Sequence, residues 1–183
     1  MRAHRLLERS FDGVVWDWGD TLMRDIEGQP GPMAEWDRVE AMPGAISALE
    51  ALARFPVHCV ATNAASSDSA QVEVALTRVG LRNRLTHVLT SSSLGHAKPD
   101  PRFFQAVSRR LGIPADRLIS IGNDLQKDIL PAKEVGMGAI LVTRPRGSPC
   151  PDGADLTVPD LVYLAKLVAP RPLPAESRRM EWT

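Results

Sequence analysis

The residues most able to do chemistry in this sequence follow short apolar runs that have the character of buried strands. The first run, residues 14–16, ends at Asp17, and a second carboxylate follows at Asp20. The first polar residue after a strand lies at its carboxyl end, where open α/β sheets bind ligands. Asp17 is therefore the first candidate for a functional carboxylate, although two aspartates at such a position also commonly shape a turn.

Three more polar clusters stand at the ends of apolar runs or just before a helix. They are Thr62-Asn63, Lys98, and the acidic segment containing Asn123, Asp124 and Asp128. The carboxyl ends of parallel strands share one edge of a sheet, so all four clusters could converge there. Each also has an ordinary structural explanation, because threonine often caps a turn, lysine is usually solvated, and aspartates suit the first turn of a helix.

The elements that would position these clusters alternate between strand and helix patterns. Strands are predicted at residues 14–16, 57–61, 85–90, 118–121 and 139–142, with an edge at 155–157, and helices at 43–54, 68–79, 101–111, 128–135 and 161–168. This alternation predicts an α/β fold with a doubly wound, Rossmann-like parallel sheet in three αβα layers. We expect one domain over residues 1–170, with a flap or loop at 24–43, and a tail at 171–183.

The composition argues against several classes of function. The 183 residues carry 22 Lys and Arg against 22 Asp and Glu, so no global charge favours nucleic acid or a membrane surface. Neither a bilayer-spanning segment nor a signal-like apolar stretch is present, and we expect a soluble, cytoplasmic protein. Cys59 and Cys150 lack metal-ligand spacing and are expected to be buried free thiols.

The order and spacing of the four clusters resemble the haloacid dehalogenase-like (HAD) hydrolase superfamily over roughly residues 14–142. That superfamily is dominated by magnesium-dependent phosphatases with an aspartate nucleophile. The resemblance implies that Asp17 is the nucleophile, that Thr62 binds the transferring phosphoryl group, and that Lys98 holds nucleophile and phosphate together. These roles are physically consistent, because a carboxylate that attacks an anionic phosphoryl group needs positive charge to offset the repulsion.

The resemblance also implies a Mg²⁺ site. Its ligands would be Asp17, the backbone carbonyl of Gly19, and the loop residues Asn123, Asp124 and Asp128. Mg²⁺ prefers oxygen ligands, commonly one or two carboxylates together with waters and substrate oxygens. Asn123 stands where the superfamily commonly has an aspartate, and its amide oxygen can bind the metal but neutralises no charge.

Gly19 is the main departure from the superfamily. Its phosphatases usually carry a second aspartate at this position, which protonates the leaving group and then activates water. Asp20 lies one residue further along, and a local turn could swing its carboxylate inward, so Asp20 is a candidate for this role. Trp18 and Asn63, next to Asp17 and Thr62, are the candidates for contacts with the substrate.

The intervals between the clusters bear on the substrate. The flap and one helix fill most of the stretch from Asp17 to Thr62, and a helix, a strand and a loop fill the stretch from Thr62 to Lys98. Neither leaves room for a sizeable cap domain. The site is therefore expected to be open, to be covered by a partner subunit of a homo-oligomer, or to act on large substrates. Dehalogenase and phosphonatase chemistry relies on cap residues and is not expected.

The leading functional interpretation is a magnesium-dependent phosphomonoester hydrolase that acts through an aspartyl-phosphate intermediate. Its substrate would be a phosphorylated molecule, small or macromolecular, with no nucleic acid and no membrane indicated. The alternative is a catalytically impaired relative that binds a phosphorylated ligand or partner without efficient turnover, which Gly19 and Asn123 favour. A phosphotransferase that hydrolyses its aspartyl-phosphate slowly lies between the two.

Overall fold

A computed structural model describes residue 6 and residues 9–64, 66–143 and 151–169 of the chain. Six parallel strands form one sheet in the order β3-β2-β1-β4-β5-β6. The strands are β1 (Gly13–Trp16), β2 (Val57–Thr62), β3 (His87–Thr90), β4 (Leu118–Gly122), β5 (Gly138–Val142) and β6 (Leu156–Val158). The predicted doubly wound α/β fold is confirmed, and the strand at 155–157 does form an edge.

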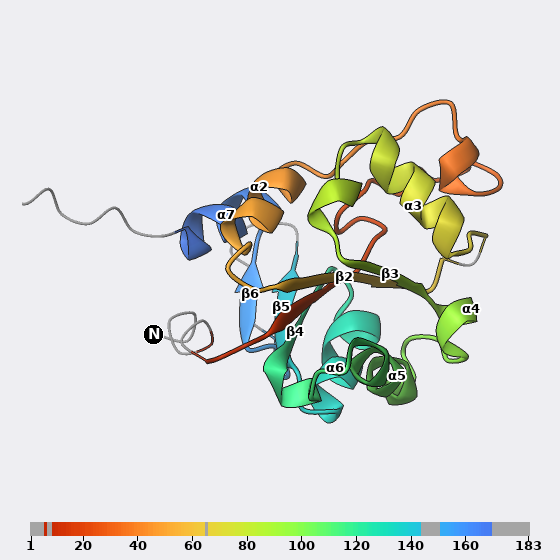
Figure 1. The fold of residues 1–183 in the computed structure, drawn as a ribbon. Coiled ribbons are helices and arrows are strands. Elements are labelled where there is room, and N and C mark those ends of the chain that lie inside the picture. Colours follow the sequence, from red (N-terminus) through yellow and green to blue (C-terminus); the bar gives the residue numbers. More distant parts are fainter. Residues whose placement is uncertain (1–5, 7–8, 65, 144–150, 170–183) are drawn as a thin grey trace, which may run out of the picture.

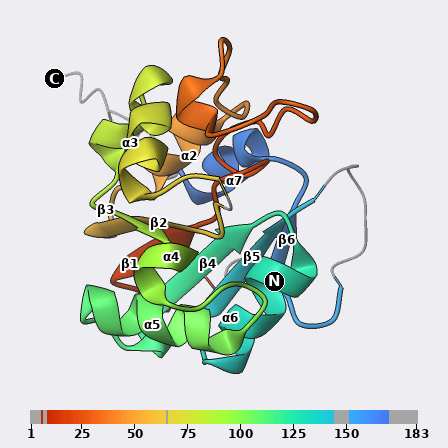
Figure 2. The same cartoon turned by 90° about the vertical axis from the view of Figure 1, so that its right-hand side faces the viewer.

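Helices cover both faces of the sheet (Figures 1 and 2). On one face lie α2 (Ala45–Ala51), α3 (Ser69–Arg78) and α7 (Leu161–Val168), and on the other lie α5 (Pro101–Leu111) and α6 (Leu130–Glu134). The short helix α4 (Ser91–Leu94) follows β3. Three 3₁₀ turns, at Met33–Glu35, Arg82–Arg84 and Ala115–Arg117, and a π turn at Leu125–Ile129 complete the regular structure of the described residues.

The apolar core lies in two layers, one on each side of the sheet. The layer under α2, α3 and α7 contains Trp16, which is fully buried, and the layer under α5 contains Phe103 and Phe104, also fully buried. Burying a large apolar side chain stabilises a fold by about 1.5–3 kcal/mol. Both layers therefore fix the central strand β1 from opposite sides, and with it the position of the residue that follows Trp16.

Three local differences from the predicted elements have physical reasons. The helix expected from residue 43 begins at Ala45, because Gly44 adopts a positive φ of 84° and packs so closely on the α7 backbone that a side chain there would collide. The loop expected after Thr90 contains α4, which a capping box between Thr90 and Ser93 starts. The helix expected from Asp128 is preceded by the π turn that begins at Leu125.

The flap at residues 24–43 is packed structure. Its Met33 and Trp36 are buried in the core layer under α3, and Trp36 donates its indole N–H to the carbonyl oxygens of Pro30 and Gly31 at 3.1 and 3.3 Å. Cys59 is a buried free thiol as expected, while Cys150 and the tail at 171–183 lie outside the described residues. None of the described helices has the length and apolar character needed to cross a bilayer.

Candidate active site

The sheet brings the four polar clusters to one edge. β1 pairs with β2 on one side and β4 on the other, so the chain changes winding direction beside β1, which is where open α/β sheets bind ligands. Asp17 continues β1 and donates its backbone N–H to the Ile121 carbonyl at 2.9 Å. Thr62 is the last residue of β2, and Asn123 follows β4 directly.

One cavity of about 260 Å³ lies at this edge. It is lined by nine of the ten residues predicted for the site, which are Asp17, Gly19, Asp20, Thr62, Asn63, Lys98, Asn123, Asp124 and Asp128, together with Asp25 and Lys127. Trp18, the tenth, lines the adjoining cavity. The sequence clusters therefore converge at one edge of the sheet, and Asp25 and Lys127 are two further lining residues that no sequence pattern indicated.

Lys98 links two of the carboxylates. Its Nζ lies 2.8 Å from Asp17 Oδ1 and 2.7 Å from Asp128 Oδ1, and only 3% of its side chain is exposed. Burial alone would lower the pKa of Lys98, but the charges and hydrogen bonds of Asp17 and Asp128 outweigh it and raise that pKa. The ammonium is therefore held in its charged form beside Asp17.

Asn63 positions Lys98 through its backbone. The Asn63 amide nitrogen donates to the Lys98 carbonyl at 2.9 Å, and its amide oxygen accepts the Lys98 N–H at 2.8 Å. Ser91 in turn donates its hydroxyl to the Asn63 carbonyl at 2.6 Å. Asn63 was predicted as a substrate contact, and the structure shows its side-chain amide engaged in holding the lysine loop against the end of β2.

Thr21 was not among the predicted site residues. It is 1% exposed, and its hydroxyl lies 2.9 Å from Asp17 Oδ2 and 3.2 Å from Asn123 Oδ1. One hydroxyl thus brings two candidate metal ligands together. Its four-residue spacing from Asp17, across a turn that starts at Asp17, is the sequence signal that could have pointed to it.

The two aspartates of the acidic loop make different contacts. Asp128 is buried, and its Oδ2 accepts the Asp124 N–H at 3.0 Å while its Oδ1 contacts Lys98. Burial, followed by the charge of Asp17, raises the pKa of Asp128 to about 6, and Lys98 only partly offsets this. Gly122 leaves room for the Asp128 carboxylate, because a Cβ at that position would collide with it.

Asp124 caps the helical segment that follows β4. Its Oδ1 accepts the N–H groups of Gln126 and Lys127 at 2.8 and 3.0 Å. Asp124 therefore serves as the N-cap of this segment, while its side chain still borders the cavity.

The donor atoms around Asp17 are chemically suited to a hard cation. Asp17, Asn123 and Asp128 all present oxygen, the ligand type that Mg²⁺ prefers. No group of three or more His, Cys, Asp or Glu side chains among the described residues is arranged as a metal cluster. A bound cation would therefore take its ligands from two or three of these side chains, from backbone carbonyls, and from water or substrate oxygens.

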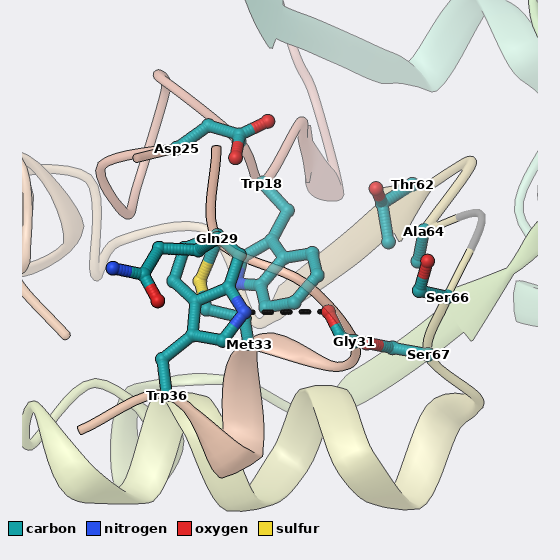
Figure 3. A pocket seen from close by; sticks show the side chains of 11 residues that line it. Trp18, Asp25, Gln29, Gly31, Met33, Trp36, Thr62, Ala64, Ser66 and Ser67 are labelled. Atoms are coloured by element: carbon teal, nitrogen blue, oxygen red, sulfur yellow. Dashed lines mark hydrogen bonds between the residues drawn. The ribbon is translucent and has the colours of Figure 1, made fainter. Parts of the chain in front are cut away.

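A second cavity, of about 280 Å³, adjoins the first (Figure 3). Its walls come from the flap and from the ends of β1 and β2, and they include Trp18, Gln29, Met33, Trp36 and Ser67. Trp18 is 5% exposed and donates its indole N–H to Met23 Sδ at 3.2 Å, so the ring is fixed in place. Gly19, Asp25 and Thr62 line both cavities.

The turn after Asp17 places Asp20 and Asp25 near each other. Asp20 has a positive φ of 54°, and its Oδ1 accepts the Asp25 N–H at 3.2 Å. Asp25 is solvent-exposed as a residue, but partial burial of its carboxyl group, followed by the charges of Asp20 and Asp17, raises the pKa of Asp25. Asp20 and Asp25 thus both line the cavity.

Comparison with solved structures agrees with this fold. An uncharacterized protein from Listeria monocytogenes serotype 4b superposes with a TM-score of 0.71 at 22% identity, over 86% of this chain and 95% of that one. The L-2-haloacid dehalogenase from Xanthobacter autotrophicus superposes with a TM-score of 0.68 at 16% identity, over 86% of this chain and 98% of that one. At these identities the likeness shows a shared fold.

Several curated relatives are phosphatases by name. A glyceraldehyde 3-phosphate phosphatase from Methanothermobacter thermautotrophicus is 40% identical over 67 residues, 37% of this chain and 30% of that protein. One from Methanocaldococcus jannaschii is 32% identical over 95 residues, 51% of this chain and 42% of that protein. A phosphoserine phosphatase from Thermus thermophilus is 34% identical over 94 residues, 50% of this chain and 38% of that protein. The matches thus span less than half the length of each of these relatives.

A family model described as haloacid dehalogenase-like hydrolase matches residues 29–136, more than half of the chain. The matched region contains Thr62, Lys98 and Asp128, and Asp17 lies just before it. Together with the parallel sheet and the convergence of these residues at its carboxyl edge, this match identifies the chain as a member of the haloacid dehalogenase-like hydrolase family.

Proposed function

We propose that the protein is a magnesium-dependent phosphomonoester hydrolase in which Asp17 attacks the phosphoryl group. The observation that carries the proposal is the buried Lys98 ammonium, 2.8 Å from Asp17 Oδ1 and 2.7 Å from Asp128 Oδ1, in a cavity that Thr62 also lines. A carboxylate without such a partner would repel an anionic ester. Lys98 both orients Asp17 and supplies charge where the phosphoryl oxygens would lie.

The remaining residues have consistent roles. Thr62 would donate its hydroxyl to a phosphoryl oxygen, and Asn63 would keep Lys98 in register with β2. Asp17, the Gly19 carbonyl, Asn123 and Asp128 would hold Mg²⁺, with Asp124 as the cap that orders their loop. When bound, the cation would offset the negative charge of the phosphoryl group.

The second cavity supports a small, polar leaving group. It combines ring surfaces of Trp18 and Trp36 with the polar side chains of Gln29, Ser66 and Ser67, and its volume is about 280 Å³. Figure 3 shows Gln29 and Trp36 on the flap side, with Thr62 and Ser66 across the pocket. Two of the relatives are named for three-carbon phosphate esters, so glyceraldehyde 3-phosphate and phosphoserine are the first compounds to assay.

A phosphate-release assay tests this function. The purified protein is assayed with a panel of small phosphate esters, with millimolar Mg²⁺ and with chelator, alongside Asp17→Asn and the matched control Asp116→Asn, which removes an exposed carboxylate near the start of β4. We expect release that depends on Mg²⁺, retained by the control and lost in Asp17→Asn. Equal release from Asp17→Asn and wild type would overturn the nucleophile assignment.

The second candidate function is binding of a phosphorylated ligand without turnover. Gly19 and Asn123 are the features that favour it, since the first removes the usual acid/base side chain and the second removes a charge from the metal loop. Absence of release from every ester, combined with Mg²⁺-dependent binding of an ester in calorimetry, would establish this function in place of hydrolysis.

A further inference from the structure

The space beside Gly19 is bordered by another carboxylate. A Cβ built on Gly19 would lie 3.7 Å from both the Cβ and the Oδ2 of Asp25, with no other heavy atom of the described residues within 4 Å apart from its chain neighbours. That distance is ordinary van der Waals contact. A side chain at position 19 would therefore extend toward the carboxylate that Asp25, six residues further along the chain, already places there.

Asp25 also lies where the two cavities meet. Among the described residues it is the one carboxylate that lines both the Asp17–Lys98 cavity and the Trp18–Trp36 cavity. If phosphorus sits beside Asp17 and the leaving group sits beside Trp18, the bridging oxygen must lie at this junction. Figure 3 shows the Asp25 carboxylate near the base of the Trp18 side chain, on the flap side of the pocket opposite Thr62.

The turn between β1 and the flap holds Asp25 in this position. The Trp18 carbonyl accepts the N–H groups of Leu22 and Met23 at 2.9 and 3.0 Å, which folds the chain back on itself. Asp20 then holds the backbone at Asp25, because its Oδ1 accepts the Asp25 N–H at 3.2 Å. This bond makes Asp20 a positioning residue for Asp25.

We propose that Asp25 is the general acid and base of this site, in place of the side chain that Gly19 lacks. The inference rests on the proposed hydrolase function. In the first step the Asp25 carboxylic acid gives its proton to the bridging oxygen as the bond from phosphorus to that oxygen breaks and the bond from Asp17 to phosphorus forms. In the second step the Asp25 carboxylate takes a proton from water as water bonds to phosphorus, and the Asp17–phosphorus bond breaks. The products are the alcohol and phosphate, and both carboxyl groups return to their starting states.

The other carboxylates at the rim are less well placed for this task. Asp20 lines only the Asp17–Lys98 cavity, and one of its oxygens is bound to the Asp25 backbone. Asp124 also lines only that cavity, and its Oδ1 accepts two helix N–H groups. Asp25 is therefore favoured over Asp20, which the sequence alone had suggested.

The first test compares Asp25→Asn with wild type on two ester classes, alkyl phosphates and aryl phosphates with an acidic leaving group. A positioned proton donor contributes about 10²–10⁴-fold in rate, and an acidic phenol needs no proton to leave. Asp25→Asn should therefore reduce kcat/KM, which reports the first step, for the alkyl ester by about a hundredfold or more, with kcat/KM for the aryl ester affected far less. Asp20→Asn keeps a side-chain oxygen that can accept the Asp25 N–H, so it should affect kcat/KM for the two classes alike.

The second test places an aspartate at position 19. In the Asp25→Asn background, Gly19→Asp should restore at least part of the alkyl phosphate activity. In the wild-type background it should give no gain, because Asp25 already borders the same space. Acid-quenched mass spectrometry should show the phosphorylated Asp17 peptide accumulating in Asp25→Asn, and thermal unfolding should show that each variant remains folded.

The outcomes separate this inference from the proposed function. Wild-type turnover with equal effects of Asp25→Asn on kcat/KM for both ester classes, or a selective effect in Asp20→Asn instead, would overturn the role of Asp25 and leave the hydrolase intact. Absence of turnover in wild type would overturn both. Selective loss of kcat/KM for the alkyl ester, repaired by Gly19→Asp, would establish Asp25 as the acid and base.

Discussion

Lys98 shows how a buried charge can be kept in a site. An isolated ammonium with 3% of its side chain exposed would lose its proton, and two carboxylates as close as Asp17 and Asp128 would repel each other. The three groups together are compatible, because each carboxylate lies within 2.8 Å of the ammonium. The pKa of Asp128 is still raised, first by burial and then by the charge of Asp17, because Lys98 offsets these effects only in part.

A buried histidine that lines neither cavity should make its own contribution to the acid sensitivity of the fold. His58 is 5% exposed, accepts the Trp16 indole N–H at its Nδ1 at 3.1 Å, and has its Nε2 3.1 Å from the Leu52 carbonyl. Because the indole can only donate, Nδ1 carries no proton in this arrangement. Burial lowers the pKa of His58, and the carbonyls of Leu52 and Phe55 only partly offset it.

The sign of the resulting pH dependence follows from linkage. Below the ordinary pKa of about 6.5, the unfolded chain binds a proton at His58 that the folded chain does not. The His58 contribution to the free energy of unfolding should therefore fall as pH drops below that value, by up to about 1.4 kcal/mol per pH unit, while the raised pKa of Asp128 contributes a slope of the opposite sign. Urea unfolding between pH 7 and pH 5 measures the sum of these slopes.

The slope can be assigned by substitution. His58→Gln should remove the His58 contribution to the pH dependence of the free energy of unfolding. His87→Gln, which replaces an exposed histidine, should retain that contribution. Equal slopes in wild type and His58→Gln would rule out His58 as the source.

At the scale of single residues, the sequence predicted the groups that end strands. Asp17, Thr62 and Lys98 follow apolar runs or precede a helix signal, and parallel pairing brings such positions to one edge. Asp25 could not be found in this way, because it sits in a flap with no periodic pattern and reaches the site only through the turn at Trp18. Its position depends on tertiary contacts that no spacing rule encodes.

At the scale of elements, the Arg78 side chain of α3 forms hydrogen bonds that hold the flap. The Arg78 guanidinium donates to three flap carbonyls, to those of Ala34 and Trp36 through Nη1 at 2.9 and 2.6 Å and to that of Asp37 through Nη2 at 3.2 Å. Its planar fork of donors suits this geometry, and lysine cannot reproduce it. Arg78 therefore controls how firmly the Trp36 wall of the second cavity is held.

Removing this attachment should loosen the flap. Arg78→Ala should lower the free energy of unfolding by about 1–3 kcal/mol, the usual range for hydrogen bonds to a charged group, and should speed hydrogen exchange at residues 33–37. It should also raise KM for small esters more than it lowers kcat, because the wall lies on the leaving-group side. Arg109→Ala, on the exposed surface of α5, is the matched control. Unchanged exchange at the flap in Arg78→Ala would show that other contacts hold it.

Elements with strong end signals were predicted more closely than those without them. The helix at 161–168 was predicted to the residue, and that at 101–111 begins at Pro101 after the cap Asp100 and ends at Gly112. The start of α2 was misplaced because the close packing of Gly44 on the α7 backbone sets the conformation there. The π turn at Leu125 was missed because its pattern is too short to be periodic. Local signals decide most boundaries, and packing decides the rest.

At the scale of the whole molecule, the order of the strands makes the site. β1 lies between β2 and β4, so the carboxyl ends of these three strands bring Asp17, Thr62 and Asn123 to one place from segments far apart in the sequence. The flap closes one side through Met33 and Trp36, and Lys98 enters from the segment before α5. The lining of both cavities thus comes mainly from loops that a rigid parallel sheet holds in position.

The proposed hydrolysis requires that Asp17 become covalently phosphorylated during turnover. Acid quenching after milliseconds of reaction with a phosphate ester and Mg²⁺, followed by mass spectrometry of the peptide containing Asp17, detects this intermediate. We expect a phosphoryl group on Asp17 that requires Mg²⁺ and is absent in Asp17→Asn. Phosphate release at the normal rate, with no phosphoryl group on Asp17 at any quench time in either wild type or Asp25→Asn, would contradict it.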